Sequence, residues 1–176
     1  MEAGKTRKET LMIRRSAVIL VTLALMVTGL APAATADQSL RPFKGTVVGE
    51  VSFPLDTSCP AGRRTDSAAV GIVSHLGRSG MTSHHCTPTG PAITGGRMTL
   101  AAANGDEVSI TYSGAAPFPG PGTEVIVVEM DFEVVGGTGR FAGATGGGEM
   151  TGYIVFAGFD APVWPASWVW EGTIGY

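Results

Sequence analysis

The sequence predicts an all-β protein, a closed barrel of eight antiparallel strands that follows a signal peptide. Three observations support this prediction. Apolar residues recur at every second position from residue 43 onward, turn signals recur at short intervals, and a glycine-dense segment at residues 136–146 joins two alternating segments. Glycine adopts positive φ without steric cost, so such a segment is typical of a tight β connection. A period of two with frequent turns excludes long helices.

The first 36 residues are predicted to be a signal peptide. Five basic residues precede an apolar run at residues 17–30, and Ala34-Thr35-Ala36 has the small-residue pattern that signal peptidase recognises. An uncleaved membrane anchor is the alternative, but the apolar run is shorter than the roughly 20 residues that a spanning helix requires. We therefore expect cleavage before Asp37, secretion to the extracellular space without a stable membrane anchor, and a single domain at residues 37–176.

Eight segments of the remaining chain have the alternation and the length of strands. They are residues 43–53, 67–76, 79–86, 93–103, 106–113, 123–135, 148–157 and 167–176. The connections between them are short. Asn104-Gly105 is the strongest hairpin signal, because a type I′ turn requires positive φ at both central positions.

Each strand is expected to bury one apolar face. The segment at residues 123–135 shows this best, with Ile126, Val128, Met130, Phe132 and Val134 on one face and Glu129, Asp131 and Glu133 on the other. The first strand places Val47 and Val51 together, and the last places Trp168 and Trp170 together. Closing eight such strands into a barrel removes exposed edges and leaves room for packed side chains or one small ligand. A two-sheet sandwich is the alternative fold.

The charge of residues 37–176 limits the classes of binding partner, and the two cysteines predict a disulfide. Residues 37–176 hold seven basic and 13 acidic residues without a continuous basic stripe, which excludes nucleic acid as a partner. Cys59 and Cys86 are an even pair in an exported chain and predict a disulfide. A metal site of His84, His85 and Cys86 is the alternative, but consecutive strand residues point to opposite faces. No metal and no cofactor are expected.

No residue of the sequence is assigned a catalytic role. Glu129, Asp131 and Glu133 resemble an acid/base set, yet their phase opposite the apolar face indicates a solvated strand exterior. No nucleophile elbow, phosphate loop or catalytic triad is present. His75 lies within the predicted strand at residues 67–76, with apolar neighbours on both faces, and is a candidate for a polar ligand contact.

The glycine-dense segment carries a family resemblance. Its pattern resembles the Gly-Gly-(Thr/Ser)-Gly-x-Phe-x-Gly signature of the allene oxide cyclase-like and dirigent-like β-barrels, and the matching residues are Gly136, Gly137, Gly139, Arg140, Phe141 and Gly143. The resemblance implies the eight-stranded barrel. The catalytic residues of plant allene oxide cyclases do not carry over, because the Asn/Asp-rich and Ser-Pro motifs are missing. We expect a structural turn, in which Phe141 closes one end of the barrel and Arg140 reaches a carboxylate or carbonyl.

Three function classes follow, and a cavity in the interior would separate the first two from the third. The first is a secreted carrier that binds a small apolar molecule against Met130, Phe132, Trp168, Trp170, Val47 and Val51. The second, implied by the resemblance, is a cyclase or isomerase acting on a hydrophobic polyketide or oxylipin. The third is a fully packed structural barrel that assembles as a homo-oligomer. Glycines at 45, 49 and 172 either leave space for a ligand or accommodate bulky neighbours in a dry core.

Overall fold

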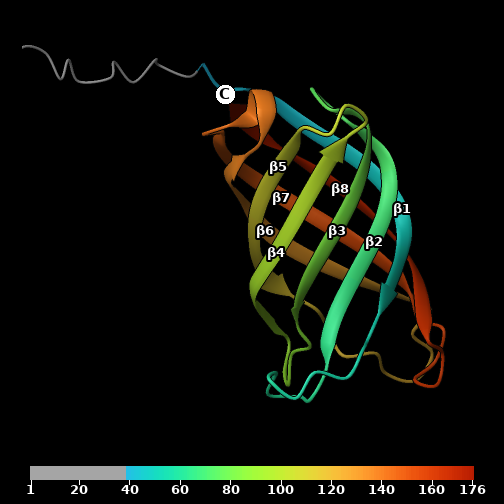
Figure 1. Cartoon of the computed structure of the whole chain (residues 1–176). Helices are drawn as coiled ribbons and strands as arrows, with labels where there is room; N and C mark the ends of the chain where they lie inside the picture. Colours follow the sequence, from blue (N-terminus) through green and yellow to red (C-terminus); the bar gives the residue numbers. More distant parts are fainter. Residues whose placement is uncertain (1–38) are drawn as a thin grey trace, which may run out of the picture. The chain divides into compact units, whose positions relative to one another are not determined.

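The computed structural model describes residues 39–176, which form a closed barrel of eight antiparallel strands (Figure 1). The strands are β1 (Arg41–Ser52), β2 (Arg64–Val73), β3 (Gly77–Cys86), β4 (Ala92–Ala102), β5 (Glu107–Ala115), β6 (Val125–Gly137), β7 (Thr145–Val155) and β8 (Val163–Gly175). Each strand pairs with the next, and β8 pairs with β1, so no edge strand remains. The predicted fold class is confirmed. The predicted signal peptide and its cleavage site before Asp37 lie outside the described residues.

The alternation seen in the sequence sets the inner and outer faces of the strands. On β6 every second residue from Ile126 to Val134 is buried, and the acidic residues between them are exposed. Burial follows the same period of two along β1 and β8. The apolar inward side chains of all eight strands belong to one core, because the closed sheet encloses a single interior.

His75 lies in a turn, so its prediction as a strand residue is wrong. Strand β2 ends at Val73, and His75 follows it with a φ of 67° in the β2–β3 connection. A tight hairpin requires such left-handed residues, and the buried positions Val73 and Leu76 are three residues apart, which a strand does not allow. The imidazole Nε2 lies 2.9 Å from the carbonyl oxygen of Pro42.

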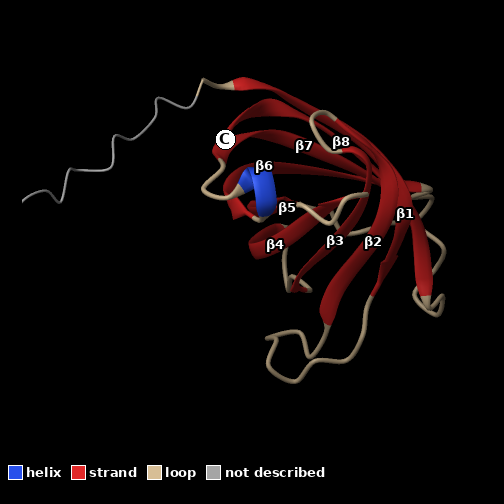
Figure 2. Cartoon of the chain, turned by 45° about the horizontal axis from the view of Figure 1, so that its top comes forward, coloured by secondary structure: helices blue, strands red, loops and turns tan. Residues whose placement is uncertain are grey.

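One end of the barrel is closed by the β6–β7 connection and the C-terminus. A short 3-10 helix, η1 (Gly139–Phe141), lies over this end, as Figure 2 shows. Phe141 is fully buried, and its ring centroid lies 4.8 Å from that of Tyr176. Arg140 lies over the Phe141 ring, forms an ion pair with Asp106 at 3.6 Å, and donates a hydrogen bond to the carbonyl of His75. Arg140 therefore contacts both a carboxylate and a carbonyl.

The opposite end carries the longer connections, at residues 53–63, 87–91, 116–124 and 156–162. The disulfide between Cys59 and Cys86 joins the first of these loops to the end of β3, with a Cα–Cα distance of 5.3 Å. This predicted disulfide is confirmed. Within residues 39–176, no helix is long and apolar enough to cross a membrane.

Candidate binding cavity

The interior of the barrel is packed toward the closed end. Phe43 contacts Phe132 and Trp170, with ring centroids 6.1 and 6.4 Å apart. The indole of Trp170 also occupies the space beside Gly45, where an added Cβ would lie 2.2 Å from Cζ2 of the indole. An added Cβ at Gly172 would meet the β7 backbone at 2.2 Å. The strand glycines at 45 and 172 thus accommodate their neighbours and leave no space for a ligand.

The other half of the barrel is hollow. A cavity of about 930 Å³ opens at the end that carries the long loops. Its apolar wall comes from inward residues of β6, β7 and β8, including Ile126, Val128, Met150 and Trp164. Cavities of this size are typical of small-molecule sites.

The residues predicted to bind a ligand divide between these two halves. Val51, Met130 and Trp168 line the cavity, whereas Val47, Phe132 and Trp170 are buried in the packed half and are not part of its lining. The period of two determines which face of the sheet a residue occupies. The period of two does not determine how far along the barrel axis a residue lies. That position follows from the strand register and from how the interior is filled.

The wall opposite the apolar strands carries polar side chains. Ser67 of β2 and Ser83 and His85 of β3 line the cavity, and Ser67 and Ser83 are register partners. Tyr112 of β5 also lines it, and its hydroxyl lies 2.9 Å from Nδ1 of His85. The two rings meet edge to face, with centroids 5.7 Å apart and an interplanar angle of 88°.

Burial keeps this pair uncharged at neutral pH. It lowers the pKa of His85 to about 4, because removal from water disfavours the imidazolium, and the nearby His84 adds to the effect. Burial likewise raises the pKa of Tyr112 to about 12, since the phenolate is disfavoured in the same way. A neutral imidazole has one nitrogen that donates and one that accepts a hydrogen bond. The pair can therefore bind a polar group of a ligand without introducing charge.

The His85–Tyr112 pair was not predicted from the sequence, in which His85 is a candidate only for a metal site with His84 and Cys86. That site is not formed, because Cys86 is bonded to Cys59 and His84 is exposed. Within residues 39–176, no group of three or more His, Cys, Asp or Glu side chains is placed to hold a metal ion. One signal for His85 is present in the sequence. His85 is four residues after the buried Met81 on the same strand, and this even spacing places both side chains on the inner face.

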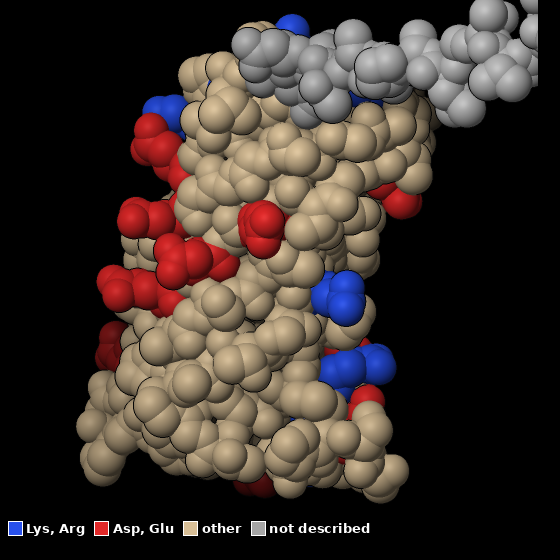
Figure 3. Space-filling view, turned by 90° about the vertical axis from the view of Figure 1, so that its left-hand side faces the viewer, with Lys and Arg blue, Asp and Glu red and all other residues tan. Residues whose placement is uncertain are grey.

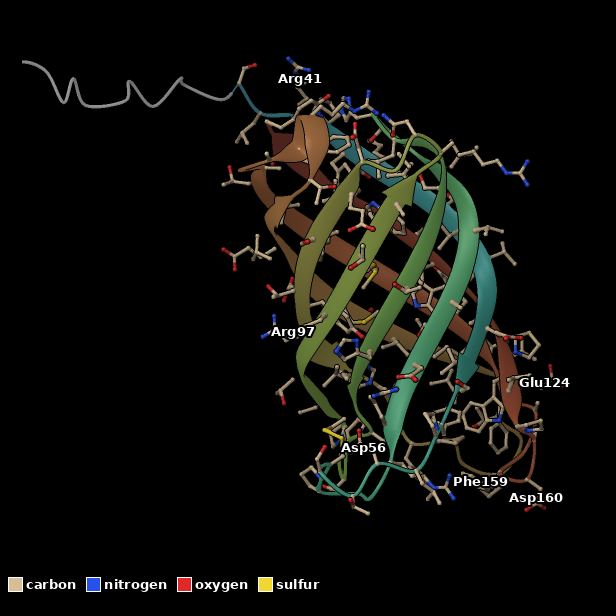
Figure 4. The ribbon with its side chains drawn as sticks, viewed as in Figure 1. Arg41, Asp56, Arg97, Glu124, Phe159 and Asp160 are labelled. Atoms are coloured by element: carbon tan, nitrogen blue, oxygen red, sulfur yellow. A yellow bond between two sulfur atoms is a disulfide. The ribbon has the colours of Figure 1, made fainter. Side chains whose placement is uncertain are left out.

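An aromatic cluster surrounds the mouth of the cavity. Phe159 stacks on Phe118 with ring centroids 5.8 Å apart, and these residues are 68% and 84% exposed. Figure 4 shows Phe159 beside Asp160 at this end of the barrel. Deeper in the mouth, Trp164 packs against Phe53 and Phe156, with ring centroids 4.6 and 5.0 Å apart. The loops at residues 116–124 and 156–162 thus present an apolar entrance.

Acidic side chains lie on the outer surface. Glu129, Asp131 and Glu133 of β6 are exposed, and Asp131 is the register partner of Glu149 on β7. Figure 3 shows acidic residues gathered along one side of the barrel. These carboxylates point away from the cavity, so they cannot act on a molecule bound inside it.

The chain matches no protein-family model, no curated protein and no solved structure. The resemblance of residues 136–146 to allene oxide cyclase-like and dirigent-like barrels therefore stays a prediction.

Proposed function

We propose that this protein binds a small, neutral, largely apolar molecule inside the open half of the barrel. The observation that supports this most is the cavity of about 930 Å³, with an apolar wall on β6 to β8 and a few polar side chains on the facing strands. This combination is typical of sites that bind small molecules by burial and orient them by a few hydrogen bonds. A fully packed structural barrel would not have such a cavity.

The charges around the cavity support a neutral ligand. Among the lining residues, the side chains that are charged at neutral pH are Arg63 and Asp160, and both lie in the loops at the mouth. The interior offers no counterion, and burying an unpaired ion is costly. An ionic ligand would therefore lose its hydration without compensation.

A titration with the fluorescent probe N-phenyl-1-naphthylamine tests the proposal, because its emission rises in apolar surroundings. Trp168→Ala and Trp170→Ala form a matched pair: both indoles face inward on β8, but only Trp168 lines the cavity. We expect Trp168→Ala to weaken binding by roughly tenfold and Trp170→Ala to leave affinity within about twofold while it lowers stability. Absence of binding to the wild type, or equal losses in both variants, would contradict cavity binding.

A cyclase or isomerase acting on a hydrophobic natural product is the second candidate. It is favoured by the hydrogen-bonded His85 and Tyr112 side chains, which lie in the cavity where they could orient a reactive substrate. Native mass spectrometry of protein purified from its own host would identify a retained molecule. Recovering that molecule unchanged after incubation favours a carrier, whereas conversion to an isomer of the same mass favours the enzyme.

A further inference from the structure

We infer that the His85–Tyr112 pair presents a single N–H donor to the cavity and selects ligands that carry a ketone, ester or similar carbonyl oxygen on a hydrocarbon body. This inference rests on the proposed function and names the class of molecule that the same cavity would take.

The backbone around Tyr112 is shaped to hold its ring. Tyr112 is the register partner of Gly96, and an added Cβ at Gly96 would lie 2.4 Å from Cε2 of the tyrosine. The pairing of β4 with β5 shifts between Ile93 and Gly96, and Gly95 has a φ of 65° within this bulge. The bulge and the missing side chain at Gly96 let the phenol lie over β4 and reach His85 on β3. The backbone of β4 therefore positions Tyr112 against His85.

The proton positions follow from the chemistry of the two groups. A phenol is a stronger acid than a neutral imidazole N–H, so the hydroxyl of Tyr112 donates to Nδ1 of His85 at 2.9 Å. The remaining proton of His85 then lies on Nε2 of a ring that lines the cavity. The pair thus leaves one donor available to a ligand.

The opposite wall defines the rest of the ligand. In the order of the closed barrel, β3 lies across from β7, whose Met150 and Ile154 line the cavity. A molecule that hydrogen-bonds to His85 therefore places its other parts against apolar side chains, including Trp168 of β8. A carbonyl satisfies Nε2 without bringing charge into the interior, while a pure hydrocarbon leaves this donor without a partner.

Two probes of the same shape test the inference. 2-Acetylnaphthalene carries a carbonyl where 2-ethylnaphthalene carries a methylene, and displacement of N-phenyl-1-naphthylamine gives both dissociation constants. The variant His85→Met keeps an unbranched side chain of similar size but has no donor. We expect His85→Met to lower the affinity for 2-acetylnaphthalene by roughly three- to tenfold and to leave the affinity for 2-ethylnaphthalene within about twofold of the wild type. His85→Gln, which places an amide N–H near the position of Nε2, should restore most of the ketone affinity.

His84→Met is the control, because His84 is the neighbouring histidine on β3, is exposed and does not line the cavity. It should change neither affinity. Infrared spectra of 13C-labelled ketone give a second readout: the carbonyl band should lie at lower wavenumber in the wild type than in His85→Met. Parallel losses for both probes, or unchanged ketone binding and carbonyl band in His85→Met, would overturn the donor inference alone. Failure of both probes to bind the wild type would overturn the proposed function as well.

Discussion

Trp170 and Gly45 are register partners on β8 and β1, and the indole fills the space that a side chain at position 45 would need. The cavity-lining residues of these two strands, such as Val51 and Trp168, all lie toward the open end from this pair. Trp170 therefore belongs to the packed half, on the closed side of the cavity. The packed half stabilises the barrel, and the hollow half remains available for a ligand.

The Trp170 contact predicts that Gly45→Ala destabilises the protein. The added methyl would overlap the indole, and accommodating it would cost roughly 1 to 3 kcal/mol. Urea denaturation followed by circular dichroism measures this as a lower midpoint. Gly80→Ala is the matched control, since Gly80 is also a strand glycine but has no atom within 4 Å of an added Cβ. Equal stability of both variants would show that Trp170 is not held against Gly45.

Removing the Phe141 ring should strongly lower stability without affecting ligand affinity. The side chain is fully buried against Tyr176 at the closed end and does not line the cavity. Phe141→Ala should cost roughly 3 to 5 kcal/mol in the free energy of unfolding. Calorimetry together with the fluorescent-probe titration checks both parts. A variant that is as stable as wild type but no longer binds would mean that the β6–β7 turn is a functional site.

The disulfide should contribute to stability and not to binding. Neither Cys59 nor Cys86 lines the cavity, and the bridge spans a sequence separation of 27 residues. Replacing both by serine should remove roughly 3 to 4 kcal/mol, because the unfolded chain regains the entropy of the open loop. Denaturation midpoints and probe affinities measured on the same preparation separate the two effects. Detection of two free thiols in protein purified under oxidising conditions would contradict the bridge.

The free energy of unfolding should fall as the pH drops from 6.5 to 4. The pKa of His85 is lowered from 6.5 to about 4 in the folded protein, so the unfolded chain binds more protons in this range. Protonation therefore favours unfolding, and the loss should be roughly 2 to 3 kcal/mol. His85→Gln should remove this part of the pH dependence. Identical slopes in wild type and variant would contradict the burial of a neutral His85.

A carboxylate adds a separate effect at lower pH. The hydrogen bonds from Ser58 lower the pKa of Asp56 below its ordinary value of 3.8. Its contribution is present above that value and is lost as the pH falls further, so it lies outside the His85 window. Comparison of the wild type with His85→Gln between pH 4.5 and 7.5 therefore measures the contribution of His85 without interference from Asp56.

Export should yield a protein that begins at Asp37. The small residues Ala34 and Ala36 provide the pattern that the peptidase recognises. Intact mass spectrometry of the secreted protein measures this directly. A product that still contains residues 17–30 would indicate a retained membrane anchor instead.

The sequence by itself determined the fold class and the inner faces of β1, β6 and β8, because alternation and turn residues act over a few neighbouring positions. Residues such as Met130 and Trp168 could therefore be assigned to the interior before the structure was known. Only the tertiary structure decided that Trp168 borders a cavity while Trp170, two positions away, fills the packed half. It also brought His85 within hydrogen-bond distance of Tyr112, 27 residues apart in sequence. Register and the β4 bulge set these long-range relationships, and no local pattern encodes them.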